Sequence, residues 1–195
     1  LENQHKLMTV KVESEVLRET QLVVCLLFQY AGMSFVDFAH LKERNIKNGI
    51  LDYNRQKTGT PMRLEILDTA ELMRKELMGD KKPASGYLFP FLSGTKTGYE
   101  AYLEYNAALS RFNRNLKALK KAAGIASDVT SYTIRHSFAM ALKEQNVPIE
   151  MISELLGHKS IKTTQIYLRS FSLEKMTEVN STCFGCVYNY VSKVG

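Results

Sequence analysis

The sequence has no tryptophan, three cysteines, four prolines and no long apolar run. Its longest uninterrupted apolar run, residues 22–28, is far too short to cross a bilayer, and we identify no secretory signal. Cys25 lies in this run and is expected in the core, whereas Cys183 and Cys186 form one CxxC pair, which is only half of a zinc site. We therefore expect no membrane partner, no bound metal, an unpaired cysteine pair in the tail, and a reducing, cytoplasmic compartment.

What the sequence does contain is typical of one globular domain with a substantial core. It has 195 residues, of which 45% are hydrophobic and 24% charged. The formal net charge of +6 and the pI of about 9.1 fit a polyanionic partner without proving one. Because the first residue is Leu1 rather than methionine, we expect the sequence to be a piece of a longer protein.

Apolar periodicity predicts a mainly helical α+β fold with a small antiparallel hairpin on one edge. The expected helices cover residues 13–30, 34–41, 68–78 and 99–123, and three more start at 130 or 131, near Pro148 and after Ser160. The period changes to two over residues 49–56 and 62–66, which predicts two strands joined by the Lys57-Thr58-Gly59-Thr60-Pro61 turn. No clear period follows Thr177.

Local signals add finer expectations. Val16 falls in the apolar stripe of the first helix, and Ser34 and Ser160 stand where helix N-caps would. Asp68 with a glutamate three residues later resembles a capping box. Strand alternation would place Arg55 and the turn lysine, two residues on, on the same side of the hairpin.

Three residues in the stretch 130–169 suit one chemistry, the attack of a phenol oxygen on a phosphodiester. Arg135 opens an apolar-periodic helix, His158 follows a Leu-Leu-Gly helix end, and Tyr167 lies on a short helix nine residues later. A planar guanidinium can donate parallel hydrogen bonds to phosphate oxygens, where charge develops in the transition state. A tyrosine can form a covalent intermediate, and a histidine can hydrogen-bond the phosphate or transfer a proton.

At these residues the sequence resembles the tyrosine recombinases, or phage-integrase family. The segments that carry the resemblance are Arg135-His136-Ser137-Phe138-Ala139, Leu155-Leu156-Gly157-His158-Lys159-Ser160, and Thr164, Tyr167 and Leu168, with Gly32-Met33 and the strand around Lys57 upstream. The resemblance covers nearly the whole chain. It implies the catalytic-domain fold of that family, with Tyr167 as nucleophile, Arg135 and His158 at the phosphate, and Lys57 as the acid that protonates the leaving 5′ oxygen.

Two positions depart from the usual family pattern. Ser34 stands where the family has its first arginine, and Tyr132 stands where it has a histidine, so one cation is missing. This altered set resembles integrases of bacterial conjugative and transposon-like elements, which implies an active enzyme. We hypothesise that Arg55 is the substitute cation, and that the Tyr132 hydroxyl can still donate to a phosphate oxygen.

The resemblance further implies DNA strand exchange through a 3′-phosphotyrosyl link, without ATP, metal or other cofactor. It implies four protomers on two DNA duplexes, a separate N-terminal DNA-clamping domain that is absent from this sequence, and a catalytic domain over residues 1–176. The tail, residues 177–195, is a candidate for docking on a neighbouring protomer, and an isolated chain is expected to be a monomer. The residues expected to face phosphates are Arg111, Arg114, Lys117, Lys121 and Lys159.

Each of these candidate residues also has a purely structural interpretation. Arg135 alone would be a surface arginine, His158 a helix-end histidine, and Tyr167 a core aromatic residue. The cations of the long helix fit a solvated face equally well. At the level of function, the alternatives are a type IB topoisomerase-like enzyme that religates the same strand, or a DNA-binding module that has lost catalysis through Ser34.

Overall fold

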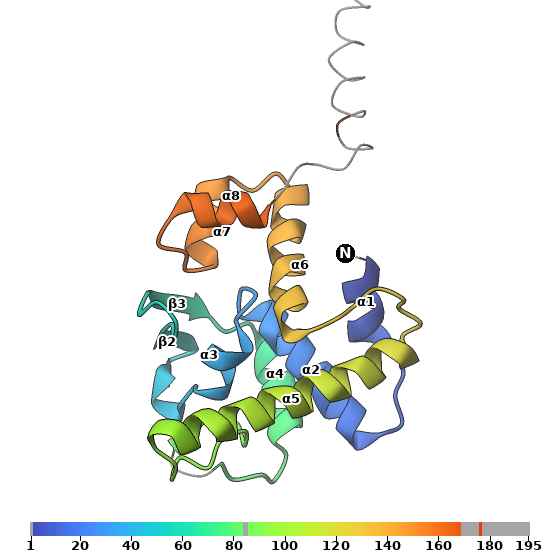
Figure 1. Cartoon of the computed structure of the whole chain (residues 1–195), viewed down its shortest axis with the longest axis vertical. Helices are drawn as coiled ribbons and strands as arrows, with labels where there is room; N and C mark the ends of the chain where they lie inside the picture. Colours follow the sequence, from blue (N-terminus) through green and yellow to red (C-terminus); the bar gives the residue numbers. More distant parts are fainter. Residues whose placement is uncertain (1, 84–85, 169–175, 177–195) are drawn as a thin grey trace, which may run out of the picture.

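The computed structural model describes residues 2–83, 86–168 and 176 of the chain. Its helices are α1 (Glu2–Thr9), α2 (Glu15–Gln29), α3 (Phe35–Ala39), α4 (Asp68–Met78), α5 (Gly98–Ala122), α6 (Ser131–Glu144), α7 (Ile149–Leu155) and α8 (Ile161–Tyr167). A short 3-10 turn, η1 (Glu43–Asn45), precedes the strands β1 (Ile46–Lys47), β2 (Ile50–Asn54) and β3 (Pro61–Glu65). The expected α+β, mainly helical fold is confirmed (Figure 1).

Helix α2 is the centre of the molecule, and it packs against α1, α4, α5 and α6 (Figure 1). Every residue from Thr20 to Leu27 is buried, because neighbouring helices cover all sides of its second half. Cys25 is among them, as predicted, and burial raises the pKa of its thiol to about 11. No helix within the described ranges is both long and apolar enough to cross a membrane.

The sheet lies at one edge, in the order β1-β2-β3, with both pairings antiparallel. Leu51, Tyr53 and Met62 are buried on one face of the sheet. On the exposed face, Asp52 of β2 lies opposite Arg63 of β3. This confirms the predicted hairpin. The two-residue strand β1 was not predicted, because so short a strand has no readable alternation.

The buried apolar residues form two clusters of unequal size. The large cluster joins α2, α3, the sheet, α4, α5 and Ile134 at the start of α6. The small cluster consists of Ala139, Ile152, Leu156 and Leu168, with five partly buried neighbours, and it joins the rest of α6 to α7 and α8. Helix α6 therefore belongs to both, and Figure 1 shows it rising from the large body toward the α7–α8 pair.

Several local predictions were wrong. Val16 is 52% exposed, because it lies before the buried stretch of α2 and lines an open hollow beside α4 and α5. The N-cap of α4 is Leu67, one residue before the expected capping box, and no side chain caps that end. Ser160 stands at the N-cap position of α8 but makes no side-chain capping bond. Helix α1 was not predicted.

Candidate active site

The start of α6 is fixed by its own cap and by α5. The Thr130 and Thr133 side chains accept hydrogen bonds from each other's backbone N–H groups, at 3.4 and 2.9 Å. The Ser131 N–H donates to the Asn113 side-chain oxygen of α5 at 2.9 Å. Because these bonds fix where α6 begins, the side chain of Arg135, in the second turn of the helix, is directed into the interior and is only 6% exposed.

The Arg135 guanidinium connects two loops that are distant in the sequence. Its Nη1 donates to the Gly32 carbonyl at 2.9 Å, and its Nη2 donates to the Leu156 carbonyl after α7. Gly32 has a φ of +63°, and a Cβ there would lie 2.9 Å from the Phe138 ring. Glycine therefore suits both the turn and the close approach of α6 that brings Arg135 within reach.

Arg55 meets Arg135 at the same carbonyl oxygen. Its Nη1 donates to the carbonyls of Leu156 and Gly157, both at 3.0 Å. Because both guanidiniums bond the Leu156 oxygen, their donor nitrogens lie within about 6 Å of each other. A Cβ on Gly157, whose φ is +61°, would lie 2.7 Å from the Arg55 Cδ.

A buried carboxylate links Arg55 to the position of the missing first arginine. Asp37 Oδ2 lies 3.5 Å from the Arg55 Nε and accepts from the Ser34 hydroxyl at 2.5 Å, while Oδ1 accepts from the Gln56 N–H at 2.7 Å. The Asp37 amide donates to the Ser34 hydroxyl at 3.4 Å, which confirms the predicted cap of α3. Sequence reasoning missed Asp37, since Ser-x-x-Asp indicates only a helix start.

The electrostatic environment of the site is set by two buried cations, Arg55 and Arg135. The Asp37 carboxylate and the carbonyl dipoles at the end of α7 offset the repulsion between Arg55 and Arg135. Burial, Arg135 and Arg55 lower the pKa of His158 to about 4, so its imidazole is neutral at pH 7.

His158 connects the arginines to the helix of the candidate nucleophile. Its backbone N–H donates to the Ser153 carbonyl of α7 at 2.9 Å. Its Nδ1 lies 2.9 Å from the Thr164 hydroxyl on α8, and Thr164 is fully buried. The backbone of Tyr167 forms the last residue of α8, one turn after Thr164. The side chain of Tyr167 lies outside the described part of the chain.

The remaining candidates lie on the surface. Lys57 and Lys159 are exposed, and Tyr132, in the first turn of α6, is 62% exposed. The inference that Arg55 and Lys57 share a strand face was wrong, because β2 ends at Asn54 and Lys57 lies in the turn that follows. Arg55 is buried, whereas Lys57 is exposed. Lys57 directly follows Gln56, whose backbone N–H donates to the Asp37 carboxylate.

The predicted basic residues of α5 lie within a sector of about 120° around the helix. Arg111, Arg114, Lys117 and Lys121 are all exposed. Asn113 marks the side of α5 that faces the start of α6, and Lys117 lies about 40° from it around the helix. Arg111 lies about 160° away and lines a separate hollow of about 370 Å³ between α2, α4 and α5.

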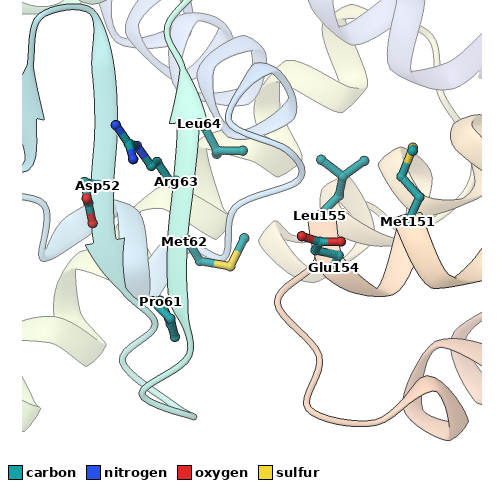
Figure 2. A pocket seen from close by; sticks show the side chains of 8 residues that line it. All are labelled: Asp52, Pro61, Met62, Arg63, Leu64, Met151, Glu154 and Leu155. Atoms are coloured by element: carbon teal, nitrogen blue, oxygen red, sulfur yellow. The ribbon is translucent and has the colours of Figure 1, made fainter.

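A larger hollow, of about 620 Å³, lies between β3 and α7 (Figure 2). Figure 2 shows Met62 extending from β3 toward Leu155 and Glu154 of α7. Its lining includes the carboxylates of Asp52 and Glu154 and the guanidinium of Arg63, but neither Arg135 nor His158. The hollow is therefore not part of the arginine site. In the described ranges, no three His, Cys, Asp or Glu side chains cluster as metal ligands would.

The chain is similar to known proteins in both sequence and fold. The model of the phage integrase family matches residues 2–174. The tyrosine recombinase XerD of Lacticaseibacillus casei is 52% identical over 54 residues, which are 28% of this chain and 18% of that protein. Among solved structures, XerA recombinase superposes with a TM-score of 0.67 at 19% identity, over 93% of this chain and 61% of that one. The Tn1549 transposon integrase in complex with a circular intermediate DNA gives 0.64 at 14% identity, over 91% and 63%.

This chain thus spans less than two thirds of the length of these relatives, and the structures below 25% identity establish the shared fold alone. The family assignment rests on the family match, which covers almost every residue that the structure describes. The chain belongs to the phage integrase family of tyrosine recombinases.

Proposed function

We propose that this chain is the catalytic domain of a site-specific DNA recombinase that cleaves and rejoins DNA through a 3′-phosphotyrosyl intermediate. The observation that carries the proposal is the convergence of Arg55, Arg135 and His158 at the end of α7, with His158 bonded to the helix that bears Tyr167. Two guanidiniums and an imidazole at one place match the needs of a phosphodiester transition state. The family match and a DNA complex among the structural neighbours support it.

In the proposed reaction, the Tyr167 phenol oxygen bonds the scissile phosphorus as the bond to the 5′ oxygen breaks. Lys57 gives its proton to the leaving 5′ oxygen, and Arg135 and Arg55 stabilise the charge on the non-bridging oxygens. His158 has two available roles: to accept the phenol proton, or to donate a hydrogen bond to the phosphate while that proton passes to water. Attack by the 5′ hydroxyl of a partner strand then reverses the chemistry.

Arg55 takes the role of the missing first arginine in this proposal. Ser34 occupies that arginine's place in the sequence, and Asp37 joins the Ser34 hydroxyl to the Arg55 guanidinium. Arg55 and Arg135 reach the same carbonyl oxygen, so both can reach one phosphate. Tyr132, exposed at the start of α6, can donate its hydroxyl to the same phosphate or its neighbour.

The partners follow from the chemistry. We expect double-stranded DNA as substrate, contacted by the exposed cations of α5 and by Lys159, and a tetramer that forms on two duplexes in the cytoplasm. The tail, residues 177–195, lies outside the described residues, and we propose that it docks on a neighbouring protomer. Deleting residues 178–195 should then leave the monomer folded but weaken assembly on DNA.

The test uses nicked duplexes taken from the ends of the genetic element that encodes the chain. Cleavage releases a short strand beyond the nick, so the covalent protein–DNA product accumulates. The proposal predicts this product for the natural sequence and none for Tyr167→Phe, with equal DNA binding by both. A pure DNA-binding module would form no product. A topoisomerase-like enzyme would instead relax supercoiled plasmid that lacks any target site.

A further inference from the structure

The Thr164 hydroxyl makes a different bond from the hydroxyls of two other helical threonines, Thr9 and Thr20. Thr9 and Thr20 donate to the carbonyl four residues earlier in their helices, at 2.7 and 2.8 Å. Thr164, which is fully buried, instead places its hydroxyl 2.9 Å from Nδ1 of His158. Within the described residues, this ring nitrogen is the hydrogen-bond partner of the Thr164 hydroxyl.

Burial decides which of the two groups donates. A threonine hydroxyl has one O–H donor and two acceptor lone pairs. A buried donor left without an acceptor is costly, whereas an unused lone pair is common. Since Nδ1 is the acceptor within reach of this buried hydroxyl, Thr164 donates and Nδ1 accepts.

The protonation state of the ring then follows. Burial and the two arginines keep His158 neutral at pH 7, and a neutral imidazole carries a single N–H. If Nδ1 accepts from Thr164, that hydrogen is on Nε2. Nε2–H can donate to an anionic oxygen, but it cannot accept a proton from a phenol.

We propose that Thr164 is a positioning residue whose buried hydroxyl fixes His158 in its Nε2–H form, the neutral form that can donate a hydrogen bond to a phosphate oxygen. The inference rests on the proposed function and chooses between the two roles left open there. It also couples the histidine to the nucleophile. The Thr164 carbonyl accepts from the Leu168 N–H at 2.8 Å, which closes the helical turn that contains Tyr167.

Nuclear magnetic resonance of the whole chain tests the assignment without any catalysis. Long-range proton–nitrogen spectra of protein labelled with nitrogen-15 histidine distinguish the two neutral forms. His158→Gln identifies the signals among the four histidines. We expect Nε2–H in the natural protein and in Thr164→Ser, and a large population of Nδ1–H in Thr164→Val. Thr163→Val, one residue away and exposed, is the matched control and should behave like the natural protein.

Single-turnover cleavage of the nicked duplex supplies the functional readout. Thr164→Val should cleave about 10- to 100-fold more slowly with unchanged DNA binding, because a misplaced hydrogen on the ring removes one phosphate donor. Thr164→Ser should stay within about threefold of the natural rate, because it retains the hydroxyl.

The outcomes separate this inference from the proposed function. Nε2–H in the natural protein that changes to Nδ1–H in Thr164→Val, together with no covalent product, would support the Thr164–His158 assignment and reject the proposed function, and with it the role of His158 at a phosphate. A natural protein with His158 in the Nδ1–H form, or a Thr164→Val variant with unchanged ring form and rate, would overturn the inference. If Thr164→Val does not fold, the spectrum of the natural protein still decides which nitrogen carries the hydrogen.

Discussion

The two apolar clusters hold different halves of the candidate site. The large cluster supports α3, the strands and the start of α6, and therefore positions Asp37, Arg55 and Arg135. The small cluster supports α7 and α8, and therefore positions His158, Thr164 and the backbone of Tyr167. The arginines are supported by the large cluster, while the helix of the candidate nucleophile is supported by four buried apolar side chains.

This division suggests how the site is held together. Both arginines donate to carbonyls at the end of α7, so their hydrogen bonds join the two halves directly. Local stability follows the amount of buried apolar contact, and the α7–α8 unit has less of it. We infer that α7 and α8 open more readily than the rest, and that the arginines limit this opening.

The largest expected effect distinguishes the two clusters by a pair of core truncations. Phe38→Ala, in the large cluster, should lower the free energy of global unfolding by about 3–5 kcal/mol. Ile152→Ala, in the small cluster, removes a similarly buried side chain but should mainly increase hydrogen exchange in α7 and α8. Equal exchange increases throughout the molecule in both variants would contradict the division.

The second prediction concerns the link between the halves. Arg55→Ala removes a guanidinium from the phosphate and two bonds to the end of α7, so cleavage of a nicked duplex should fall about 100- to 1000-fold. Arg63→Ala, on the exposed face of the hairpin, is the matched control and should cleave normally. Full activity of Arg55→Ala would remove Arg55 as the substitute cation.

The third prediction concerns the far end of α8. The Lys143 ammonium of α6 donates to the Leu168 carbonyl at 2.9 Å, and a cation there also interacts favourably with the helix C-terminus. Lys143→Met keeps the aliphatic stem and should destabilise α8 locally by about 1 kcal/mol. The measurement is amide exchange of α8, for which Lys143→Arg should resemble the natural protein. Unchanged exchange in Lys143→Met would show that the bond does not hold α8.

The last prediction concerns the pH dependence of stability. His158 has a pKa of about 4 in the folded chain against an ordinary value of 6.5. Between these values the unfolded chain binds more protons, so the free energy of unfolding should rise with pH across the window from 4 to 6.5. Urea titrations at several pH values measure this rise, and His158→Gln should reduce it. Equal pH profiles for the two proteins would show that burial and the arginines do not lower this pKa.

The sequence predicted what depends on local chemistry. Apolar periodicity located α2, α5 and α6, and Ser34 caps α3 as expected. It could not predict the partner of Arg55, because Asp37 and Leu156 are 18 and 101 residues away along the chain. The strand-alternation argument placed Arg55 beside Lys57, but the strand ends at Asn54, and the inward direction of Arg55 is set by tertiary contacts.

The candidate site residues also divide into those that local sequence identified and those whose roles depend on tertiary contacts. The motif around His158 identified the histidine, but Thr164 gained a role only once α8 was folded against it. The basic residues of α5 have helical spacing, yet Arg111 faces the hollow beside α2 rather than the start of α6. Spacing along one helix cannot show which side the neighbouring elements cover.

The most direct test of the central claim is to map the covalent product. The natural protein is reacted with the nicked duplex, digested with protease and nuclease, and analysed by mass spectrometry for the peptide that carries a nucleotide. We predict the nucleotide on Tyr167, with the product lost in Arg135→Ala. A nucleotide on any other residue, or an equal yield from Arg135→Ala, would contradict the account.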